Sequence, residues 1–401
     1  MPQYRALSKP LVRALSEATG LDGLEVPPAL CRGVAALSRL FTRERNSLAA
    51  CYLADEALRV AYLAYYLPVN LAKVQALLAE MPAYPVGAFS PARPLSVLDL
   101  GSGPGTAALG VLDWILQSPS LSPIPVEVVA VDRSAPGLVE CERLWHLYTR
   151  LVSAPGARLL PVHADLERSG RLGDLKAGKR GPYDLIVMAN TLNELFLTSR
   201  DPIRRRAKLV RALLDLLHES GTLMIVEPAL REVSRNLHRL RDILLEEHAC
   251  TVYSPCLHER PCPALVKEDD WCHEERPWTP PPLVTAIDRQ VGFIKDALKF
   301  SYLLLRKDGR TIVPRAPTVY RVVSELREMK GEKRAWLCNE TGRPEVGRLD
   351  RERSETNTEL DDWHRGAIVQ IDQIVRKDRK GRESTIGRIP ANATVEVLRL
   401  V

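Results

Sequence analysis

The chain has 401 residues, which is longer than one hydrophobic core usually organises, so two or three domains are expected. Its composition of 45% hydrophobic and 26% charged residues is that of an ordinary globular protein. No apolar run approaches the roughly 18 residues that indicate a transmembrane helix, and the first twenty residues have no signal-peptide core. These features predict a cytoplasmic protein without membrane contact.

The net charge of +6 is modest, but the basic residues are clustered. Residues 200–211, RDPIRRRAKLVR, hold six positive charges against one negative, and residues 376–388, RKDRKGRESTIGR, hold six against two. Clusters of this kind suit a phosphate backbone, because each neutralised phosphate releases counterions. A solvated helix face and a solvated loop are the alternative interpretation of the two segments.

The N-terminal part of the chain is predicted to be a helical domain, residues 1–90. Apolar residues recur at three and four positions throughout residues 30–81, and Pro68 is the one helix breaker. Residues 84–94, YPVGAFSPARP, read as a linker rich in proline and glycine.

From Leu95 the pattern changes to short apolar strands that alternate with helices, which predicts a doubly wound α/β domain over residues 91–310. The segments LSVLDLG, VEVVAVD, YDLIVMAN and GTLMIVEP are typical of buried parallel strands. A helix is expected from Leu230 to His248, then a strand at CTVYS and a last strand at residues 300–307. Residues 311–401 contain strand-like runs such as AIVQIDQIV and predict a small β-rich domain.

The loop VLDLGSGPGT is the clearest binding motif in the chain. Asp99 ends the first strand, and Gly101, Gly103 and Gly105 allow the backbone to turn sharply toward a ligand at the start of a helix. Position 106 is Thr, where a dinucleotide-binding fingerprint would have its third glycine.

Acidic residues also follow the second and third strands of this domain. Asp132 is placed to accept hydrogen bonds from ribose hydroxyls, and Asp165 could meet an adenine amino group. With the glycine loop, these residues resemble the cofactor site of class I S-adenosylmethionine-dependent methyltransferases. Asn190 follows the fourth strand and completes the candidate set, but no catalytic residue can be named, because capping of the next helix explains Asn193 and Glu194 equally well.

A second candidate site is the cysteine-rich insertion over residues 254–282, in which the span 256–273 is too polar and too interrupted by proline for a core helix or strand. Cys256, Cys262 and Cys272 lie within it, and Cys338 lies in the β-rich tail. Four thiolates can close a zinc site or hold an iron-sulfur cluster, and His258 and His273 offer further zinc ligands, so composition leaves the metal open. The other cysteines, Cys31, Cys51, Cys141 and Cys250, are expected to be small buried residues.

Together the segments VLDLGSGPGT, ANTLNEL, VYSPCLHERPCPALVKEDDWCH and KFSYLLLRK resemble the ribosomal small-subunit methyltransferase-like family, which includes mitochondrial methyltransferase-like protein 17 and bacterial homologues. The resemblance runs from about Leu37 to Cys338. It implies a class I methyltransferase fold, association with the small ribosomal subunit and its rRNA, and a [4Fe-4S] cluster. The cluster ligands carried over by the resemblance are Cys256, Cys262, Cys272 and Cys338. The chain departs from the expected pattern at Leu257 and Glu274, and neither change removes a ligand.

Three functions remain open at this point. The first is an RNA-binding factor in small-subunit assembly with S-adenosylmethionine as a structural ligand, and the second is an active rRNA methyltransferase. The third is a zinc-stabilised oxidoreductase on a dinucleotide fold, which the loop argues against. The sequence does not determine the oligomeric state.

Overall fold

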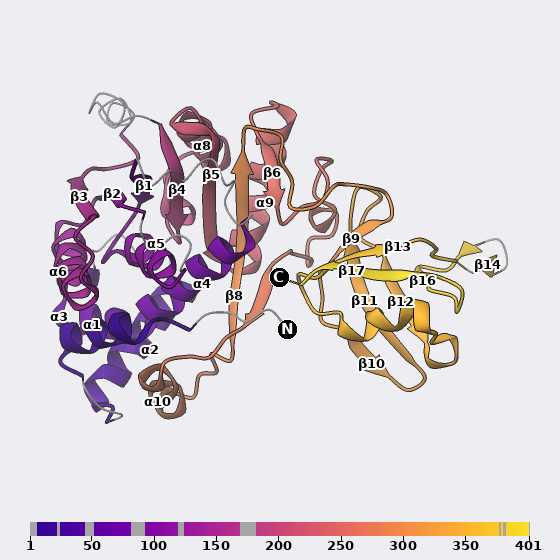
Figure 1. Ribbon diagram of the computed structural model, residues 1–401, viewed down its shortest axis with the longest axis horizontal. Helices are drawn as coiled ribbons and strands as arrows, with labels where there is room; N and C mark the ends of the chain where they lie inside the picture. The colour runs from indigo at the N-terminus through magenta and orange to yellow at the C-terminus, as the bar shows by residue number, and fades with distance from the viewer. Residues whose placement is uncertain are drawn as a thin grey trace.

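Two separate sheets organise the part of the chain described by the computed structural model (Figure 1). The structure describes all residues except 1–5, 22–24, 45–51, 82–92, 119–123, 169–181, 377, 380–381 and 401. The predicted linker at 84–94 and Cys51 therefore lie wholly or largely outside the described residues. No described helix is both long enough and apolar enough to cross a membrane.

The N-terminal part is helical, as the periodicity predicts. Its elements are α1 (Lys9–Thr19), α2 (Pro28–Thr42), the 3-10 turn η2 (Tyr52–Ala54), α3 (Glu56–Ala61), the π-helix η3 (Tyr62–Tyr66) and α4 (Leu67–Glu80). Pro68 does not end this run: η3 passes directly into α4, and the amide of Leu67 donates to the carbonyl of Tyr62, five residues back. The irregularity falls instead on η3, and π-helical turns inside helices occur frequently at functional sites.

The larger sheet has the strand order β3-β2-β1-β4-β5-β8-β6, and β7 also pairs with β8. Its strands are β1 (Leu95–Leu100), β2 (Val126–Asp132), β3 (Ala157–His163), β4 (Tyr183–Ala189), β5 (Leu217–Pro228), β6 (Thr251–Ser254), β7 (Glu274–Pro277) and β8 (Ala297–Arg306). β1 to β5 are parallel, whereas β8 is antiparallel to both β5 and β6. This order, with one reversed strand before the last, is that of class I methyltransferases, and the predicted fold class is confirmed.

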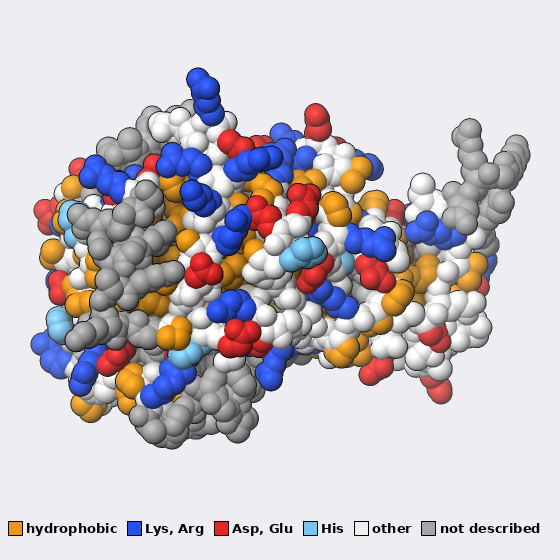
Figure 2. All heavy atoms as spheres, turned by 90° about the horizontal axis from the view of Figure 1, so that it is seen from above, with side chains coloured by type: hydrophobic (Ala, Val, Ile, Leu, Met, Phe, Trp, Pro, Cys, Tyr) orange, Lys and Arg blue, Asp and Glu red, His pale blue; other side chains and the backbone are white. Residues whose placement is uncertain are grey.

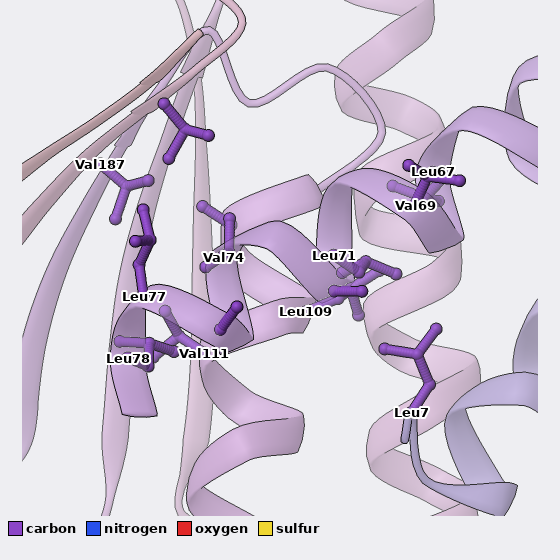
Figure 3. Packing of buried hydrophobic residues seen from close by; sticks show 14 of the residues in the cluster. Leu7, Leu67, Val69, Leu71, Val74, Leu77, Leu78, Leu109, Val111 and Val187 are labelled. Atoms are coloured by element: carbon purple, nitrogen blue, oxygen red, sulfur yellow. The ribbon is translucent and has the colours of Figure 1, made fainter. Parts of the chain in front are cut away.

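Helices cover both faces of this sheet because alternate strand residues are apolar on each side. On one face, Val97 and Val187 join a core with α4, α5 (Thr106–Leu116) and α6 (Ala135–Val152). On the other, Leu98 and Ile186 pack with α8 (Pro202–Leu214) and α9 (Arg231–Glu246). α4 lies against α5, with Leu71 beside Leu109 and Leu78 beside Val111 (Figure 3).

The cysteine-rich insertion contains a short strand, β7, which lies just beyond residues 256–273 and which the sequence pattern does not indicate. Its four residues are Glu-Glu-Arg-Pro, yet Glu274 and Arg276 are each 2% exposed and pair along β8. A charged strand can be buried because each charge meets an opposite one there. A helix, α10 (Pro282–Val291), follows and contacts α2 and η3.

The C-terminal part forms the second sheet, with the order β16-β12-β11-β9-β13-β17 and β10 on β11. Its strands are β9 (Val319–Val322), β10 (Arg327–Met329), β11 (Glu332–Cys338), β12 (Glu345–Leu349), β13 (Ile368–Ile371), β16 (Ile386–Arg388) and β17 (Val395–Arg399), with β14 (Asp378–Arg379) and β15 (Arg382–Glu383) as a separate pair. Two short 3-10 helices, η6 (Asp350–Glu352) and η7 (Glu355–Asp362), join β12 to β13. This sheet has its own core, which includes Val322, Leu337 and Trp363. The exact domain boundaries at 90 and 310 stay predictions.

A buried cluster of charges joins the three parts of the molecule. Glu80, at the end of α4, accepts a hydrogen bond from Tyr302 of β8 at 2.6 Å and pairs with Arg276 of β7 at 3.3 Å and Arg321 of β9 at 3.4 Å. Glu274 pairs with Arg276 at 3.0 Å and with Arg321 at 3.1 Å. Burial acts to raise the pKa of Glu80, but the two guanidinium groups outweigh it, and the pKa is lowered.

We expect Glu80→Ala to lower the free energy of unfolding by about 3–5 kcal/mol, because it leaves Arg276 and Arg321 buried with one carboxylate between them. Urea denaturation of the full chain measures this. The matched control is Glu232→Ala, which removes an exposed pair with Arg239 and should cost about 0–1 kcal/mol. Equal losses in the two variants would contradict a structural role for the cluster.

Candidate functional site

The glycine loop between β1 and α5 needs its glycines for different reasons. Gly101, Gly103 and Gly105 all have positive φ, at 70°, 52° and 92°. A Cβ on Gly101 would lie 2.1 Å from Oγ1 of Thr191, and one on Gly105 would lie 2.9 Å from Sγ of Cys141. At Gly103 the nearest atom would be Cδ1 of Leu53, at 4.0 Å. The first and third glycines therefore allow close packing, and the second chiefly allows the turn.

Asp99 holds this loop in shape from behind. Its side chain is 1% exposed, and Oδ2 accepts hydrogen bonds from Oγ of Ser102 at 2.8 Å and from the amide of Ala108 at 3.0 Å. Burial raises the pKa of this carboxyl to about 7. The structure therefore gives Asp99 a role in connecting the loop to α5, and direct contact with a cofactor stays a prediction.

Asp132, at the end of β2, lies against the same loop. Oδ2 accepts from the amide of Gly103 at 2.7 Å, and Oδ1 accepts from the amide of Ser134 at 2.7 Å. Burial raises the pKa of Asp132, while these hydrogen bonds lower it in part. The structure brings Asp132 together with the glycine loop, and each carboxylate oxygen retains capacity to accept a ligand hydroxyl.

The two remaining predicted residues have different surroundings. Asp165 follows β3, is partly exposed, and uses Oδ1 to accept from the amide of Glu167 at 3.0 Å. Asn190 follows β4 with φ of 58°, and its amide donates to the carbonyl of Val226 at 2.7 Å. Its Oδ1 is buried and has no hydrogen-bond partner among the described residues. A positive φ in a residue other than glycine often marks a functional position.

Residues of the N-terminal helices cover this edge of the sheet. Besides Leu53, Tyr62 lies here: burial raises the pKa of its hydroxyl, and hydrogen bonds with Asn70 and Thr106, the first residue of α5, lower it in part. Nδ2 of Asn70 is 3.4 Å from the Tyr62 hydroxyl, and Nζ of Lys73 donates to Oδ1 of Asn70 at 3.1 Å.

Glu227 ends β5 beside these groups and was missed by the sequence analysis. It is 1% exposed, and Oε1 accepts from the amide of Asn193 at 3.3 Å, while Oε2 has no partner among the described residues. Burial raises the pKa of Glu227 to about 8 and lowers that of Lys73 to about 7, and the charge of Glu227 partly restores the Lys73 value. The available sequence signal was a pair of polar residues, Asn70 and Lys73, three apart in the otherwise apolar start of α4.

The turn after β4 is fixed by a buried guanidinium. Arg206 of α8 is 6% exposed and donates to the carbonyl of Asn193 at 2.9 Å and twice to that of Leu195, at 2.9 and 2.8 Å. This arginine belongs to the basic segment 200–211, so one charge of that segment is used inside the protein. The hydrogen bonds from Arg206 hold the turn after β4 in place against β5.

The cysteine-rich segment begins directly after β6 and is organised by one face of α9. Arg235 donates to the carbonyls of Ala264, Lys267 and Asp270, at 3.1, 2.6 and 2.6 Å. The buried Arg241 donates to the carbonyl of Arg260 at 2.7 Å, and also to that of His258. His238 lies between them, with Nε2 3.3 Å from the carbonyl oxygen of Cys272.

The four predicted ligand cysteines share one neighbourhood. Burial raises the pKa of Cys338, and the charges of Cys272, Cys256 and Cys262 raise it further, so the four thiols act on one another across the two chain segments. Sγ of Cys338 also lies 3.8 Å from Nε2 of His258. All four are free thiols.

Within the described ranges, no group of three or more histidine, cysteine, aspartate or glutamate side chains is arranged to hold a metal ion. The donor chemistry suits iron-sulfur or zinc, but the side-chain positions do not supply a formed site. The predicted cluster is therefore not supported by this structure.

Comparison with known proteins identifies the family. The model of the family described as mitochondrial small ribosomal subunit Rsm22 matches residues 56–349. The chain belongs to this family. The match begins at α3 and ends at β12, so it includes the glycine loop, the edge with Asn190 and Glu227, and all four cysteines of the Rsm22-family chain. No match was found among curated proteins.

Solved structures similar to this Rsm22-family chain are methyltransferases of low sequence identity. Magnesium protoporphyrin IX methyltransferase from Synechocystis PCC 6803 is 12% identical, over 68% of this chain and 97% of that one, with a TM-score of 0.34. A methyltransferase from Leishmania major is 13% identical, over 76% and 85%, with a TM-score of 0.35. Aeropyrum pernix fibrillarin is 13% identical, over 57% and 74%, with a TM-score of 0.29.

We expect Gly101→Ala to lower the free energy of unfolding by about 2 kcal/mol more than Gly103→Ala. Both substitutions place alanine at positive φ, which costs about 1–2 kcal/mol, but only the first forces a clash with Thr191. Chemical denaturation of the two variants beside the wild type measures the difference. Equal losses would contradict the close packing of the loop against Thr191.

Proposed function

We propose that this protein is an S-adenosylmethionine-dependent methyltransferase that acts on the RNA of the small ribosomal subunit. The family match over residues 56–349 carries the proposal, because it spans both the loop and the acceptor edge. The cofactor would supply an electrophilic methyl group. Gly101, Gly103 and Asp132 would bind its nucleoside and amino-acid parts, and Asn190 would lie where the acceptor approaches.

The outer face of α8 supports contact with RNA. Arg204, Arg205 and Lys208 are exposed there, and Arg200 and Arg211 extend the same surface. Figure 2 looks down on the end of the molecule where α8 lies and shows lysine and arginine side chains gathered there. Some of the charge is already paired, since Arg204 lies 3.4 Å from Asp201 and Arg211 contacts Glu247. Side chains of the second basic segment are described only in part.

We propose further that Cys256, Cys262, Cys272 and Cys338 hold a [4Fe-4S] cluster, with zinc as the alternative. Four free thiols in one neighbourhood support this, and Arg235 and Arg241 fix the backbone between Cys256 and Cys272. The cytoplasmic location expected from the sequence belongs to the same proposal.

A second candidate is an assembly factor that binds the small subunit and transfers no methyl group. The exposed basic face of α8 favours it, because RNA binding requires only that surface. An oxidoreductase function is not adopted, since the loop has Thr106 where the dinucleotide fingerprint has glycine, and β8 is antiparallel to β5.

The deciding experiment incubates the full chain with small subunits from cells that lack it and with S-adenosylmethionine labelled in its methyl group. We expect labelled rRNA with the wild type and none with Gly103→Arg, whose side chain would occupy the space above the loop. Particles that co-sediment with the protein in a salt-sensitive manner but gain no label would favour the assembly factor instead.

Metal content is measured separately, on anaerobically purified protein. The proposed cluster predicts about four iron and four sulfide per chain with absorption near 400 nm, and both should fall in a Cys256→Ser, Cys262→Ser variant. Cys250→Ser is the matched control, because that thiol lies just before β6. About one zinc per chain without sulfide would favour a zinc site over the iron-sulfur cluster. Protein that contains no metal would contradict both.

A further inference from the structure

Two buried oxygen atoms at neighbouring strand ends lack hydrogen-bond partners among the described residues. They are Oε2 of Glu227, near the end of β5, and Oδ1 of Asn190, directly after β4. The two strands pair in parallel with Ala189 opposite Val226, so the two residues that follow are next to each other in register. Both atoms are acceptors at the edge of the sheet that carries the glycine loop, so a ligand with hydrogen-bond donors would satisfy both.

The charges around this pair suit a neutral donor. Lys73 of α4 and Arg206 of α8 are the nearby cations, and Glu227 and Glu194 are the nearby carboxylates, so the charges balance. A neutral amino group offers two N–H donors without disturbing that balance. The exocyclic amino group of a nucleobase has this chemistry, and the basic face of α8 would hold the RNA that carries it.

We propose that Glu227 is the proton acceptor in methyl transfer to an exocyclic amino nitrogen of an RNA base, and that Oδ1 of Asn190 holds the second N–H. The nitrogen lone pair forms the N–C bond to the methyl carbon as the carbon–sulfur bond breaks and its electron pair stays on sulfur. The N–H proton passes to the Glu227 carboxylate. This inference rests on the proposed methyltransferase function.

The surroundings of Glu227 suit a base. Proton transfer is most efficient when the pKa of the base lies near the operating pH, and the pKa of Glu227 is raised to about 8 by burial. The backbone amide of Asn193 donates to the other carboxylate oxygen, Oε1, and a hydrogen bond from the Asn193 side chain also acts on the carboxylate, so the group is fixed in position. Arg206 fixes Asn193 in turn, through its carbonyl.

The kinetic test compares Glu227→Gln with wild type in the transfer reaction on small subunits, with digestion of the rRNA to nucleosides. We expect the methyl group on an exocyclic nitrogen and a rate about 10²- to 10⁴-fold lower in the variant, with S-adenosylhomocysteine binding unchanged. Glu219→Gln is the matched control, since Glu219 lies at the other end of β5, exposed.

A second readout does not depend on turnover. Saturation-transfer NMR with S-adenosylhomocysteine present should detect contact with adenosine or cytidine, which carry exocyclic amino groups, and weaker contact with uridine, which does not. Asn190→Gly keeps the positive φ without strain and should remove this preference.

The outcomes separate the two proposals. A wild type that labels rRNA while Glu227→Gln keeps its rate, or a methyl group found on ribose, on carbon or on protein, would overturn this inference alone. A wild type that binds the nucleosides without preference would also overturn it. A wild type that transfers no methyl group would remove the proposed function and this inference with it.

Discussion

The arrangement of the three parts of the molecule depends most on a buried cluster of four charges that includes Glu80. Two glutamates and two arginines are removed from water where α4, the central sheet and the C-terminal sheet meet, and each has an opposite charge within 3.4 Å. Such a cluster contributes little net stability compared with apolar packing. Loss of one member, however, would leave an opposite charge buried and unpaired, which is strongly destabilising. The cluster therefore fixes which surfaces of the three parts face one another.

Because Glu80 lies at its end, α4 connects the two candidate sites. Its first turns carry Asn70 and Lys73 to the edge with Glu227, and its apolar face packs on α5, which begins at the glycine loop (Figure 3). At its other end the charge cluster reaches Arg321, whose pKa is raised by Glu274 and also by the charge of Cys272.

The sequence predicts those features of the fold and of the candidate site that short local patterns determine. Apolar strands followed by the glycine loop and Asp132 are found where expected, because a buried parallel strand and its tight turn leave strong signals in a few residues. β7 escaped prediction because its residues are charged and its burial depends on Arg321, which lies far away in the sequence. Glu227 and Lys73 escaped for a similar reason, since only the fold places them side by side. Convergence of the four cysteines on a metal stays a prediction.

In the helical region, too, the sequence predicts the elements but not the details that depend on the fold. Periodicity predicts helices through residues 30–81, but it cannot show that the irregular turn falls at Tyr62–Tyr66 and not at Pro68. The π-helical turn ends directly before Leu67 and Pro68, and Tyr62 within it packs near Thr106 and Asn70. Tertiary contacts decide where such an irregular turn forms. These contacts lie at the edge of the larger sheet that the proposed function uses.

The central claim is that the glycine loop and Asp132 bind S-adenosylmethionine. Isothermal titration of the full chain with this compound tests it most directly, with Asp132→Ala and Asp165→Ala as variants. The account predicts about one molecule bound per chain and at least about tenfold weaker binding in Asp132→Ala, which corresponds to roughly 1.4 kcal/mol, with a smaller effect in the more exposed Asp165→Ala. No binding by the wild type, or equal binding by Asp132→Ala, would contradict it.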